Sequence, residues 1–239
     1  MKIKAVTFDF WDTLVADHPR QIRALQVAAW DEVLRDAGVR VDPDELKAAF
    51  NANWAEFERR WQANAGQHTA ADSTGFICRR LGINPDGLRA ELMGAFGKVG
   101  ERAPLEQAPQ LAATLRTLAD AGLRLGIVCD VGLTPSATLR ERLEGFGVMR
   151  YFDAWSFSDE TDWFKPAPQA FQPALDGLGA DPAETVHVGD SPRTDVAGAL
   201  ALGMSAVRYT GFVDRAPRDE PEATFVVSSH ARLPALLGL

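Results

Sequence analysis

The sequence is poor in cysteine and has no excess of basic residues. Its two cysteines, Cys78 and Cys129, form neither a C-x-x-C pair nor a metal-ligand cluster, so we expect reduced thiols and a cytoplasmic location. The 25 Lys and Arg residues are outnumbered by 33 Asp and Glu residues, giving a formal net charge of −8. This balance argues against a nucleic-acid partner, because binding to a phosphate backbone requires a basic surface.

Long apolar runs are also missing. No stretch approaches the roughly 20 apolar residues that a membrane-spanning helix needs, and the first residues lack the apolar core of about 7–15 residues that is typical of a signal peptide. We therefore expect no membrane partner and no signal peptide. The 239 residues, 46% of them hydrophobic and 24% charged, suit a soluble core domain with a second, inserted domain.

The apolar periodicity predicts two different regions. Residues 3–8 are expected to form a buried strand, and the next segments have helical spacing: 20–37, 43–61, 70–81 and 85–98. From residue 108 the pattern alternates, with helices at 108–121, 135–144, from 168 and 195–202, a short last helix, and strands at 124–130, 154–157, 185–188, 205–208 and 224–227. Alternating strands and helices predict an α/β fold with a doubly wound parallel sheet. The helical block is then an insertion after the first strand.

Two of the predicted strands end in an acidic residue. Asp9 follows the strand at 3–8, and Asp190 follows the strand at 185–188 through Gly189. Open α/β sheets bind their ligands at the carboxyl ends of their strands. A carboxylate there can serve as a nucleophile or as a metal ligand, and two such strand ends side by side would form a site for a divalent metal and a phosphate.

Four separated segments together resemble the haloacid dehalogenase superfamily of hydrolases, in the subgroup with a helical cap inserted after the first motif. In order, they are Asp9-Phe10-Trp11-Asp12-Thr13-Leu14, Ile127-Val128-Cys129-Asp130-Val131-Gly132, Lys165 before Pro166-Ala167-Pro168, and Gly189-Asp190-Ser191-Pro192-Arg193-Thr194-Asp195. The resemblance implies a Rossmann-like catalytic core formed by residues 1–16 and 102–239. Residues 17–101 would form the helical cap domain.

The resemblance also implies roles for individual residues. Asp9 would be the nucleophile that forms a covalent aspartyl intermediate. Lys165 would pair with Asp9 and with the substrate anion. Mg²⁺ would be bound by the Asp9 carboxylate, the main-chain carbonyl of Trp11 and Asp190. Asp195 would contribute to the metal site indirectly or through water, and it would serve as a helix N-cap instead of this role or in addition to it.

Two positions depart from the phosphatase pattern. Phosphatases of this superfamily usually carry a second Asp, the general acid and base, where this chain has Trp11. Indole cannot replace it, and whether Asp12 or water does so is left open. The Trp11 side chain itself would either bind the substrate or pack against the cap. Cys129 stands where Ser or Thr is usual. Its backbone N–H and that of Asp130 would bind the substrate anion, or Cys129 is a small buried residue.

For several other side chains a structural role competes with a functional one. Arg193 is either a substrate contact or a surface residue. His187 is interpreted as a core or cap-facing residue. Four aromatic residues at helical spacing predict a seam that is mostly cap core, although one or two could face the active site: Phe50, Trp54, Phe57 and Trp61.

Three functions are compatible with the sequence. The favoured hypothesis is a Mg²⁺-dependent phosphatase, monomeric or homodimeric, that acts on a small phosphorylated metabolite through an aspartyl-phosphate. The second is carbon–halogen hydrolysis of a 2-haloacid, which the bulky Trp11 supports and which has no need of a metal. The third is a catalytically weak relative that binds a ligand. The sequence does not identify the substrate.

Overall fold

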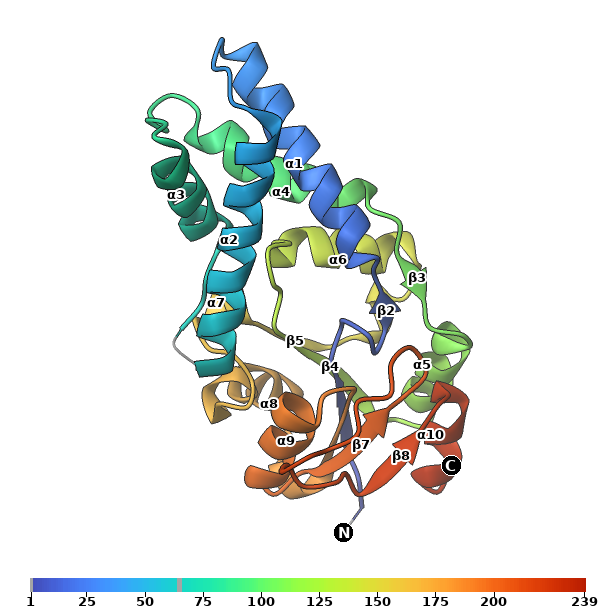
Figure 1. Ribbon diagram of the computed structural model, residues 1–239. Helices are drawn as coiled ribbons and strands as arrows, with labels where there is room; N and C mark the ends of the chain where they lie inside the picture. Colours follow the sequence, from blue (N-terminus) through green and yellow to red (C-terminus); the bar gives the residue numbers. More distant parts are fainter. Residues whose placement is uncertain (1, 64–65) are drawn as a thin grey trace. The chain divides into compact units, whose positions relative to one another are not determined.

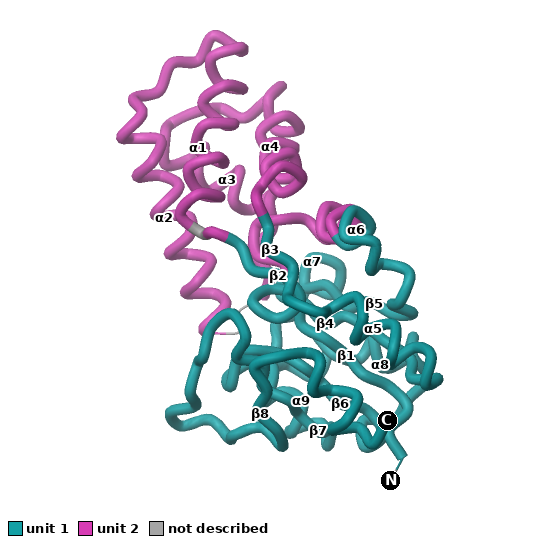
Figure 2. The backbone as a smooth tube through the Cα atoms, turned by 90° about the vertical axis from the view of Figure 1, so that its right-hand side faces the viewer, with its two compact units in different colours: residues 1–17, 105–130, 143–239 teal, residues 18–104, 131–142 magenta. Residues whose placement is uncertain are grey.

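A computed structural model describes residues 2–63 and 66–239. The chain divides into two compact units (Figure 2). The sheet unit comprises residues 1–17, 105–130 and 143–239, and the helical unit comprises residues 18–104 and 131–142.

A six-stranded parallel sheet forms the centre of the sheet unit. Its strand order is β5-β4-β1-β6-β7-β8, and the strands are β1 (Ala5–Phe8), β4 (Arg124–Cys129), β5 (Ala154–Phe157), β6 (Thr185–Gly189), β7 (Ser205–Tyr209) and β8 (Phe225–Val227). The four residues of β1 are all buried. Such continuously buried strands are typical of a parallel sheet that is covered on both faces.

The strand order places β1 at the point where the chain reverses its direction across the sheet. After β1 the chain builds β4 and β5 on one side, and it then returns to build β6, β7 and β8 on the other. Ligands of open α/β sheets bind at such a reversal, beyond the carboxyl ends of the strands. Asp9, the first residue after β1, therefore lies where a ligand is expected.

Helices cover both faces of this sheet (Figure 1). On one side lie α8 (Gln172–Leu178) and α9 (Ala197–Ala201), and on the other lie α5 (Leu111–Asp120) and α10 (Leu233–Leu236). Phe171, Leu175 and Val196 pack with Val128 of β4 and Ala206 of β7 in one buried cluster. This packing holds the strands from which the candidate site residues project.

The helical unit contains four long helices. They are α1 (Pro19–Asp36), α2 (Pro43–Ala63), α3 (Ala70–Leu81) and α4 (Arg89–Arg102). The Asp42 carboxylate accepts hydrogen bonds from the first turn of α2, and Thr69 forms a capping box at the start of α3. The rings of Trp30, Phe50 and Phe96 meet at centroid distances of 5.3–6.1 Å and form the core.

Residues 131–142 belong to the helical unit although they follow β4. The Arg142 guanidinium donates to the carbonyl oxygens of Glu101 and Ala103 at 2.7 and 2.9 Å. Gly100 of α4 lies so close to Thr134 that an added Cβ would come within 2.7 Å of its methyl group. The helix α6 (Ser136–Gly145) therefore begins in the helical unit and ends in the sheet unit.

The predicted fold class is confirmed, with local differences. The helix expected from residue 85 begins at Arg89, and the helix expected at 195–202 starts instead with a π-helical turn, Pro192–Val196. The sequence pattern did not indicate α7 (Ser158–Thr161) or a two-stranded sheet of β2 (Val15–Ala16) and β3 (Glu106–Gln107). The boundaries of the core and cap domains stay a prediction. Among the described residues, no helix has the length and apolarity to cross a membrane.

Candidate active site

Asp9 is held at the carboxyl end of the central strand. Its backbone N–H donates to the carbonyl of Val188 in β6 at 2.8 Å, and its side chain is almost fully buried. The Thr13 hydroxyl approaches one carboxylate oxygen, Oδ2, at 3.5 Å. The other oxygen, Oδ1, accepts a hydrogen bond from Lys165.

Lys165 joins two carboxylates that come from distant parts of the chain. Its Nζ donates to Asp9 Oδ1 and to Asp195 Oδ1, both at 2.6 Å, and to the carbonyl of Val128 at 3.0 Å. The side chain is 2% exposed. The Asp130 carboxylate accepts from the backbone N–H of Lys165 at 3.0 Å, which fixes this segment at the end of β4. An ammonium with three acceptors is fully used, so Lys165 is a fixed positive charge beside Asp9.

Asp195 is oriented by donors on both of its oxygens. Oδ2 accepts from the backbone N–H of Ser191 at 2.9 Å, and Oδ1 is 3.1 Å from Nε2 of His187. The other ring nitrogen of His187 lies 2.9 Å from the Thr7 hydroxyl. The helix N-cap is Ser191, whose hydroxyl accepts from the Thr194 N–H, so the alternative prediction that Asp195 is the N-cap was wrong.

Gly189 is required by the position of Asp195. A Cβ at Gly189 would lie 2.3 Å from Cγ of Asp195, far inside van der Waals contact. Glycine therefore allows β6 to pass directly against this carboxylate, and the next residue, Asp190, can face Asp9.

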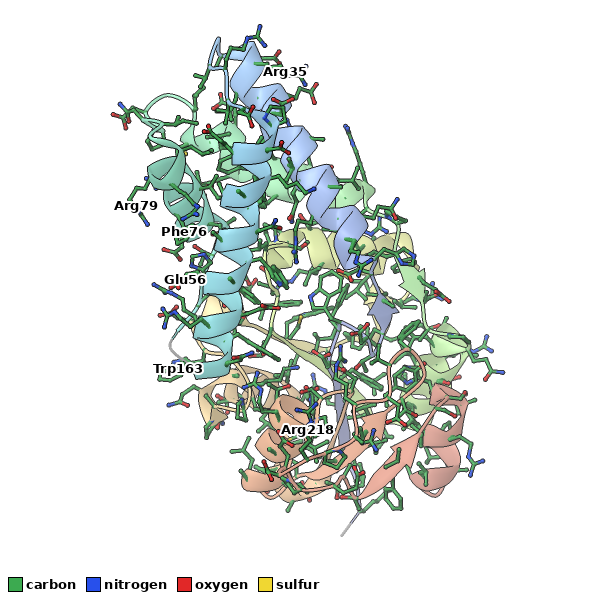
Figure 3. All side chains as sticks on the ribbon, in the orientation of Figure 1. Arg35, Glu56, Phe76, Arg79, Trp163 and Arg218 are labelled. Carbon is green, nitrogen blue, oxygen red and sulfur yellow. The ribbon has the colours of Figure 1, made fainter. Side chains whose placement is uncertain are left out.

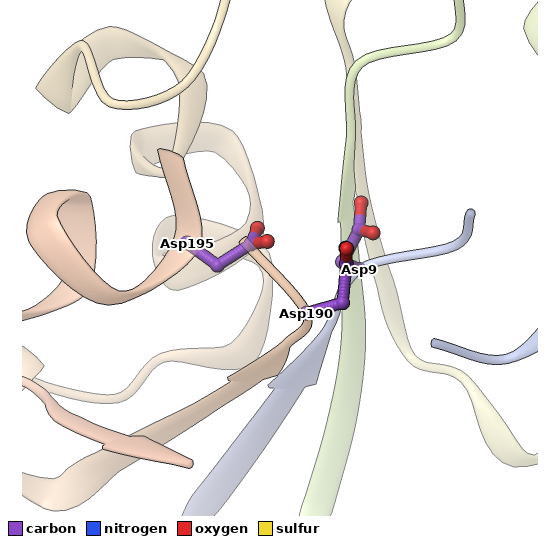
Figure 4. A group of neighbouring side chains, drawn as sticks. All are labelled: Asp9, Asp190 and Asp195. Atoms are coloured by element: carbon purple, nitrogen blue, oxygen red, sulfur yellow. The ribbon is translucent and has the colours of Figure 1, made fainter. Parts of the chain in front are cut away.

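Asp9, Asp190 and Asp195 form a compact group of buried carboxylates (Figure 4). One oxygen of each lies within 4.8 Å of the others, and the figure shows Asp9 and Asp190 side by side at the ends of neighbouring strands, with Asp195 directed toward them from a helical turn. Buried carboxylate oxygens are the donors that Mg²⁺ prefers. Asp195 already has three close donors, Lys165, His187 and the Ser191 N–H, whereas Oδ2 of Asp9 has only a long contact of 3.5 Å with the Thr13 hydroxyl among the described residues. Asp9 and Asp190 are therefore the better direct ligands.

The electrostatics of the group leave room for a further cation. Burial raises the pKa of Asp9 to about 7, although Lys165 acts in the opposite direction. Burial also raises the pKa of Asp195, but Lys165 and His187 outweigh it and the pKa is lowered overall. Burial lowers the pKa of Lys165, yet Asp195 and Asp9 hold it well above its usual range. A second positive charge beside Asp9 would favour its ionised form.

The residues after Asp9 form a tight turn, and the acid in this turn, Asp12, is engaged elsewhere. Leu14 N–H and Val15 N–H both donate to the carbonyl of Phe10, and the ring of Trp11 packs edge-on against that of Phe10 at 4.9 Å. Asp12 takes a left-handed conformation with φ of 55°, and its carboxylate binds the guanidinium of Arg215 at 2.7 Å. Asp12 is therefore engaged in an ion pair, which makes it a poor general acid.

The remaining predicted residues lie around this group. Cys129 is 1% exposed at the end of β4. Burial raises the pKa of its thiol well above the usual value, which favours the protonated thiol over a reactive thiolate. Arg193 is half-buried, and burial lowers its pKa while the charges of Asp130, Glu220 and Asp195 raise it. The substrate-binding roles of Trp11, Cys129, Asp130 and Arg193 stay predictions.

Sequence reasoning missed Thr7 and Arg215. It interpreted His187 as a core or cap-facing residue, and His187 is buried, but its contact with Asp195 was not foreseen. The parallel register pairs Thr7 of β1 with His187 of β6, so two polar side chains at matched positions of adjacent buried strands were the available signal. Arg215 lies in the polar loop between β7 and β8, where no periodicity or motif distinguishes it from its neighbours.

Comparison with known proteins identifies the family. The family model for haloacid dehalogenase-like hydrolases matches residues 3–203. The chain belongs to this family of hydrolases. The prediction of an enzyme of this superfamily is therefore confirmed.

Several relatives are phosphatases. A glyceraldehyde 3-phosphate phosphatase of Methanothermobacter thermautotrophicus is 34% identical over 225 residues, covering 92% of this chain and 91% of that protein. A phosphoserine phosphatase of Thermus thermophilus is 31% identical over 247 residues, with 93% of each covered. Other curated relatives match over about half their length. The bovine haloacid dehalogenase-like hydrolase domain-containing protein 3 is 36% identical over 127 residues, 52% of this chain and 49% of that protein.

Solved structures resemble the whole chain. A haloacid dehalogenase-type phosphatase from Thermococcus onnurineus superposes with a TM-score of 0.69 at 28% identity, covering 99% of this chain and 98% of that one. A 2-haloacid dehalogenase from Pseudomonas syringae superposes with a TM-score of 0.73 at 23% identity and the same coverage. At that identity the second comparison shows a shared fold only.

Proposed function

We propose that the protein is a Mg²⁺-dependent phosphatase that acts on a small phosphorylated metabolite through an aspartyl-phosphate on Asp9. The observation that carries this proposal is Lys165 Nζ at 2.6 Å from both Asp9 and Asp195, beside a third buried carboxylate, Asp190. Lys165 contacts two of these three neighbouring carboxylates, and a divalent cation at Asp9 and Asp190 would balance negative charge that Lys165 leaves uncompensated. The full-length phosphatase relatives support the same activity.

In the first step, an oxygen of the Asp9 carboxylate attacks phosphorus. A bond forms between that oxygen and phosphorus, and the bond from phosphorus to the leaving oxygen breaks with its electron pair. Lys165 holds one Asp9 oxygen and places a positive charge beside the phosphoryl group. Asp195, fixed by His187 and Ser191, keeps Lys165 in this position.

In the second step, water attacks phosphorus and its bond to Asp9 breaks, which releases inorganic phosphate and restores the carboxylate. Mg²⁺ held by Asp9, Asp190 and the Trp11 main-chain carbonyl would supply positive charge against the phosphoryl oxygens. Positioning and electrostatic stabilisation provide most of the catalysis in phosphoryl transfer.

Trp11 restricts the substrates that this mechanism serves. No carboxylic acid stands at this position to protonate the leaving oxygen, and Asp12 is paired with Arg215. General acid catalysis typically contributes about 10²–10⁴-fold, and its loss matters least when the leaving oxygen is a weak base. We therefore propose that acyl and aryl phosphates are turned over faster than alkyl phosphates.

The test is phosphate release from a panel of alkyl, aryl and acyl phosphates, with Mg²⁺ and with EDTA. Asp9→Asn should lower turnover by at least about 10³-fold, while the matched Asp219→Asn on the exposed β7–β8 loop should leave it unchanged. Mg²⁺-dependent release that Asp9→Asn abolishes supports the proposal. Release of halide from 2-haloacids in EDTA, without release of phosphate, would contradict it and establish the dehalogenase alternative.

A further inference from the structure

The loop between β7 and β8, residues 210–224, brings a second cation to the acidic group. The Arg215 guanidinium contacts Asp190 Oδ2 through Nη1 and lies 2.7 Å from Asp12 Oδ2 through Nη2. The side chain of Asp190 is 7% exposed and that of Arg215 is 44% exposed. Arg215 therefore reaches from the surface to a buried carboxylate, and it does so from a segment outside the four motifs.

The loop is tied down next to Arg215. Arg208 of β7, which is 5% exposed, donates to Asp214 at 2.6 Å and to both oxygens of Glu222 at 3.0 Å. A bidentate guanidinium–carboxylate pair with a buried partner is a strong and directional contact. Because Asp214 immediately precedes Arg215, this ion-pair group fixes the start of the segment that carries the guanidinium.

The backbone conformation of Asp12 is a second observation that concerns the position of Arg215. Its φ of 55° lies in the left-handed region, where a glycine would be accommodated at lower cost. A carboxylate at this position provides what glycine cannot, namely the ion pair with Arg215. The two ends of the guanidinium are thus bound by Asp12, which is 25% exposed, and by the buried Asp190.

We propose that Arg215 and the divalent cation of the active site compete for the Asp190 carboxylate, so that Arg215 sets the metal affinity of the enzyme. This inference rests on the metal site of the proposed function. The guanidinium and the metal would bind the same carboxylate at short range, and two cations there repel each other. When the metal binds, Arg215 leaves Asp190 and stays attached to Asp12.

The experiment measures the affinity of the metal-stripped full-length protein for Mn²⁺ by electron paramagnetic resonance, without substrate. Four proteins are compared: wild type, Arg215→Gln, Arg215→Lys and Arg218→Gln. Arg218 is an exposed arginine of the same loop (Figure 3), so its substitution makes the same change of net charge away from Asp190. Thermal melting confirms that each variant is folded.

Arg215→Gln should bind Mn²⁺ at least about 5-fold more tightly than wild type, within the usual range of coupling between two sites. Arg218→Gln should match wild type. Arg215→Lys keeps the charge, so its affinity should lie nearer to wild type than to Arg215→Gln, which a purely steric role would not produce. Equal or weaker Mn²⁺ binding by Arg215→Gln, with wild type binding normally, overturns the inference alone. If neither wild type nor Arg215→Gln binds Mn²⁺, the metal site of the proposed function is contradicted as well.

Discussion

In the sheet unit, the buried ionised side chains of Asp9, Lys165 and Asp195 share hydrogen bonds of 2.6 Å, whereas buried neutral side chains keep polar atoms without a partner, most of them in the helical unit. In the described part of the helical unit these atoms include Asn53 Nδ2, His68 Nδ1, both amide atoms of Gln67, and Ser73 Oγ, and in that of the sheet unit they include Gln107 Nε2 and His230 Nδ1. An ionised group in a low-dielectric interior must be compensated, while a neutral group costs much less. The difference indicates that the charges of the sheet unit are maintained for chemistry, and that each charged group there depends on the others.

The largest effect is expected from Lys165→Met. It leaves Asp9 and Asp195 without their shared cation, so stability should fall by about 3–5 kcal/mol, as when one partner of a buried ion pair is removed. Turnover should fall by at least about 10²-fold, because a charge positioned for the transition state is lost. Urea unfolding and steady-state kinetics measure the two effects.

The matched control is Lys4→Met, which removes an exposed ion pair with Glu184 at 2.8 Å and should change stability by less than about 1 kcal/mol. If Lys165→Met is as active and as stable as Lys4→Met, the buried ion pairs of Lys165 contribute no more than the exposed pair of Lys4 with Glu184, which would contradict the account.

A pH effect is expected from His230, a second buried group of the sheet unit. Burial lowers its pKa to about 4, although its hydrogen bond to the carbonyl of Thr13 acts in the opposite direction. Since the folded-state pKa lies below the unfolded value of 6.5, the neutral form contributes stability that is complete above pH 6.5 and is lost as the pH falls to 4. The loss should reach at most about 3 kcal/mol.

This contribution is measured as the difference in urea unfolding between wild type and His230→Gln, which does not titrate and can still donate to Thr13. The stability of wild type should fall more steeply than that of the variant between about pH 6.5 and pH 4. Parallel pH profiles for the two proteins would show that His230 does not titrate as its burial requires.

The buried hydroxyl group of Thr7, which has a hydrogen-bond partner, provides the next test. Thr7→Val removes the partner of His187 Nδ1 and leaves a buried ring nitrogen unsatisfied, so we expect a loss of about 1–2 kcal/mol. The volume of the side chain hardly changes, which separates this effect from packing. Thermal and urea unfolding would detect it, and a stability equal to that of wild type would remove Thr7 from the hydrogen-bonded group.

The smallest effect is expected from Ser73→Ala in the helical unit. Ser73 is as fully buried as Thr7, but its hydroxyl has no hydrogen-bond partner in the described structure. Its removal should leave stability unchanged or raise it by up to about 1 kcal/mol, because no bond is lost and a buried polar group is eliminated. If Ser73→Ala lowered stability as much as Thr7→Val does, the hydroxyl of Ser73 would contribute as much to stability as the hydrogen-bonded hydroxyl of Thr7, which would contradict the comparison.

The parts of this protein that could be predicted from the sequence are those with local signals. An apolar strand that ends in an acid predicted the positions of Asp9 and Asp190. Helical periodicity predicted α1, α2 and α3 closely, whereas α4 begins and ends about four residues later than expected. The fold class followed from the alternation of strands and helices. The likeness of four spaced motifs to a known superfamily supplied Lys165, which no periodicity distinguishes from a surface lysine.

The remaining features depend on tertiary contacts. The bond between His187 and Asp195 requires the π-helical turn after β6, and a strand pattern does not specify such a turn. Arg215 is 203 residues from Asp12 in the sequence and lies in a polar loop, so only the folded chain brings the two together. The two-residue strands β2 and β3 are too short to produce a sequence pattern.

The most direct test of the proposed mechanism is to look for the covalent intermediate on Asp9. The enzyme is mixed with Mg²⁺ and an acyl phosphate, quenched with acid during the first turnovers, digested and analysed by mass spectrometry. The mechanism predicts a phosphoryl group on Asp9 in the peptide that contains the end of β1, and none in Asp9→Asn. Turnover of the substrate with no phosphoryl group on Asp9, or with one on another residue, would contradict it.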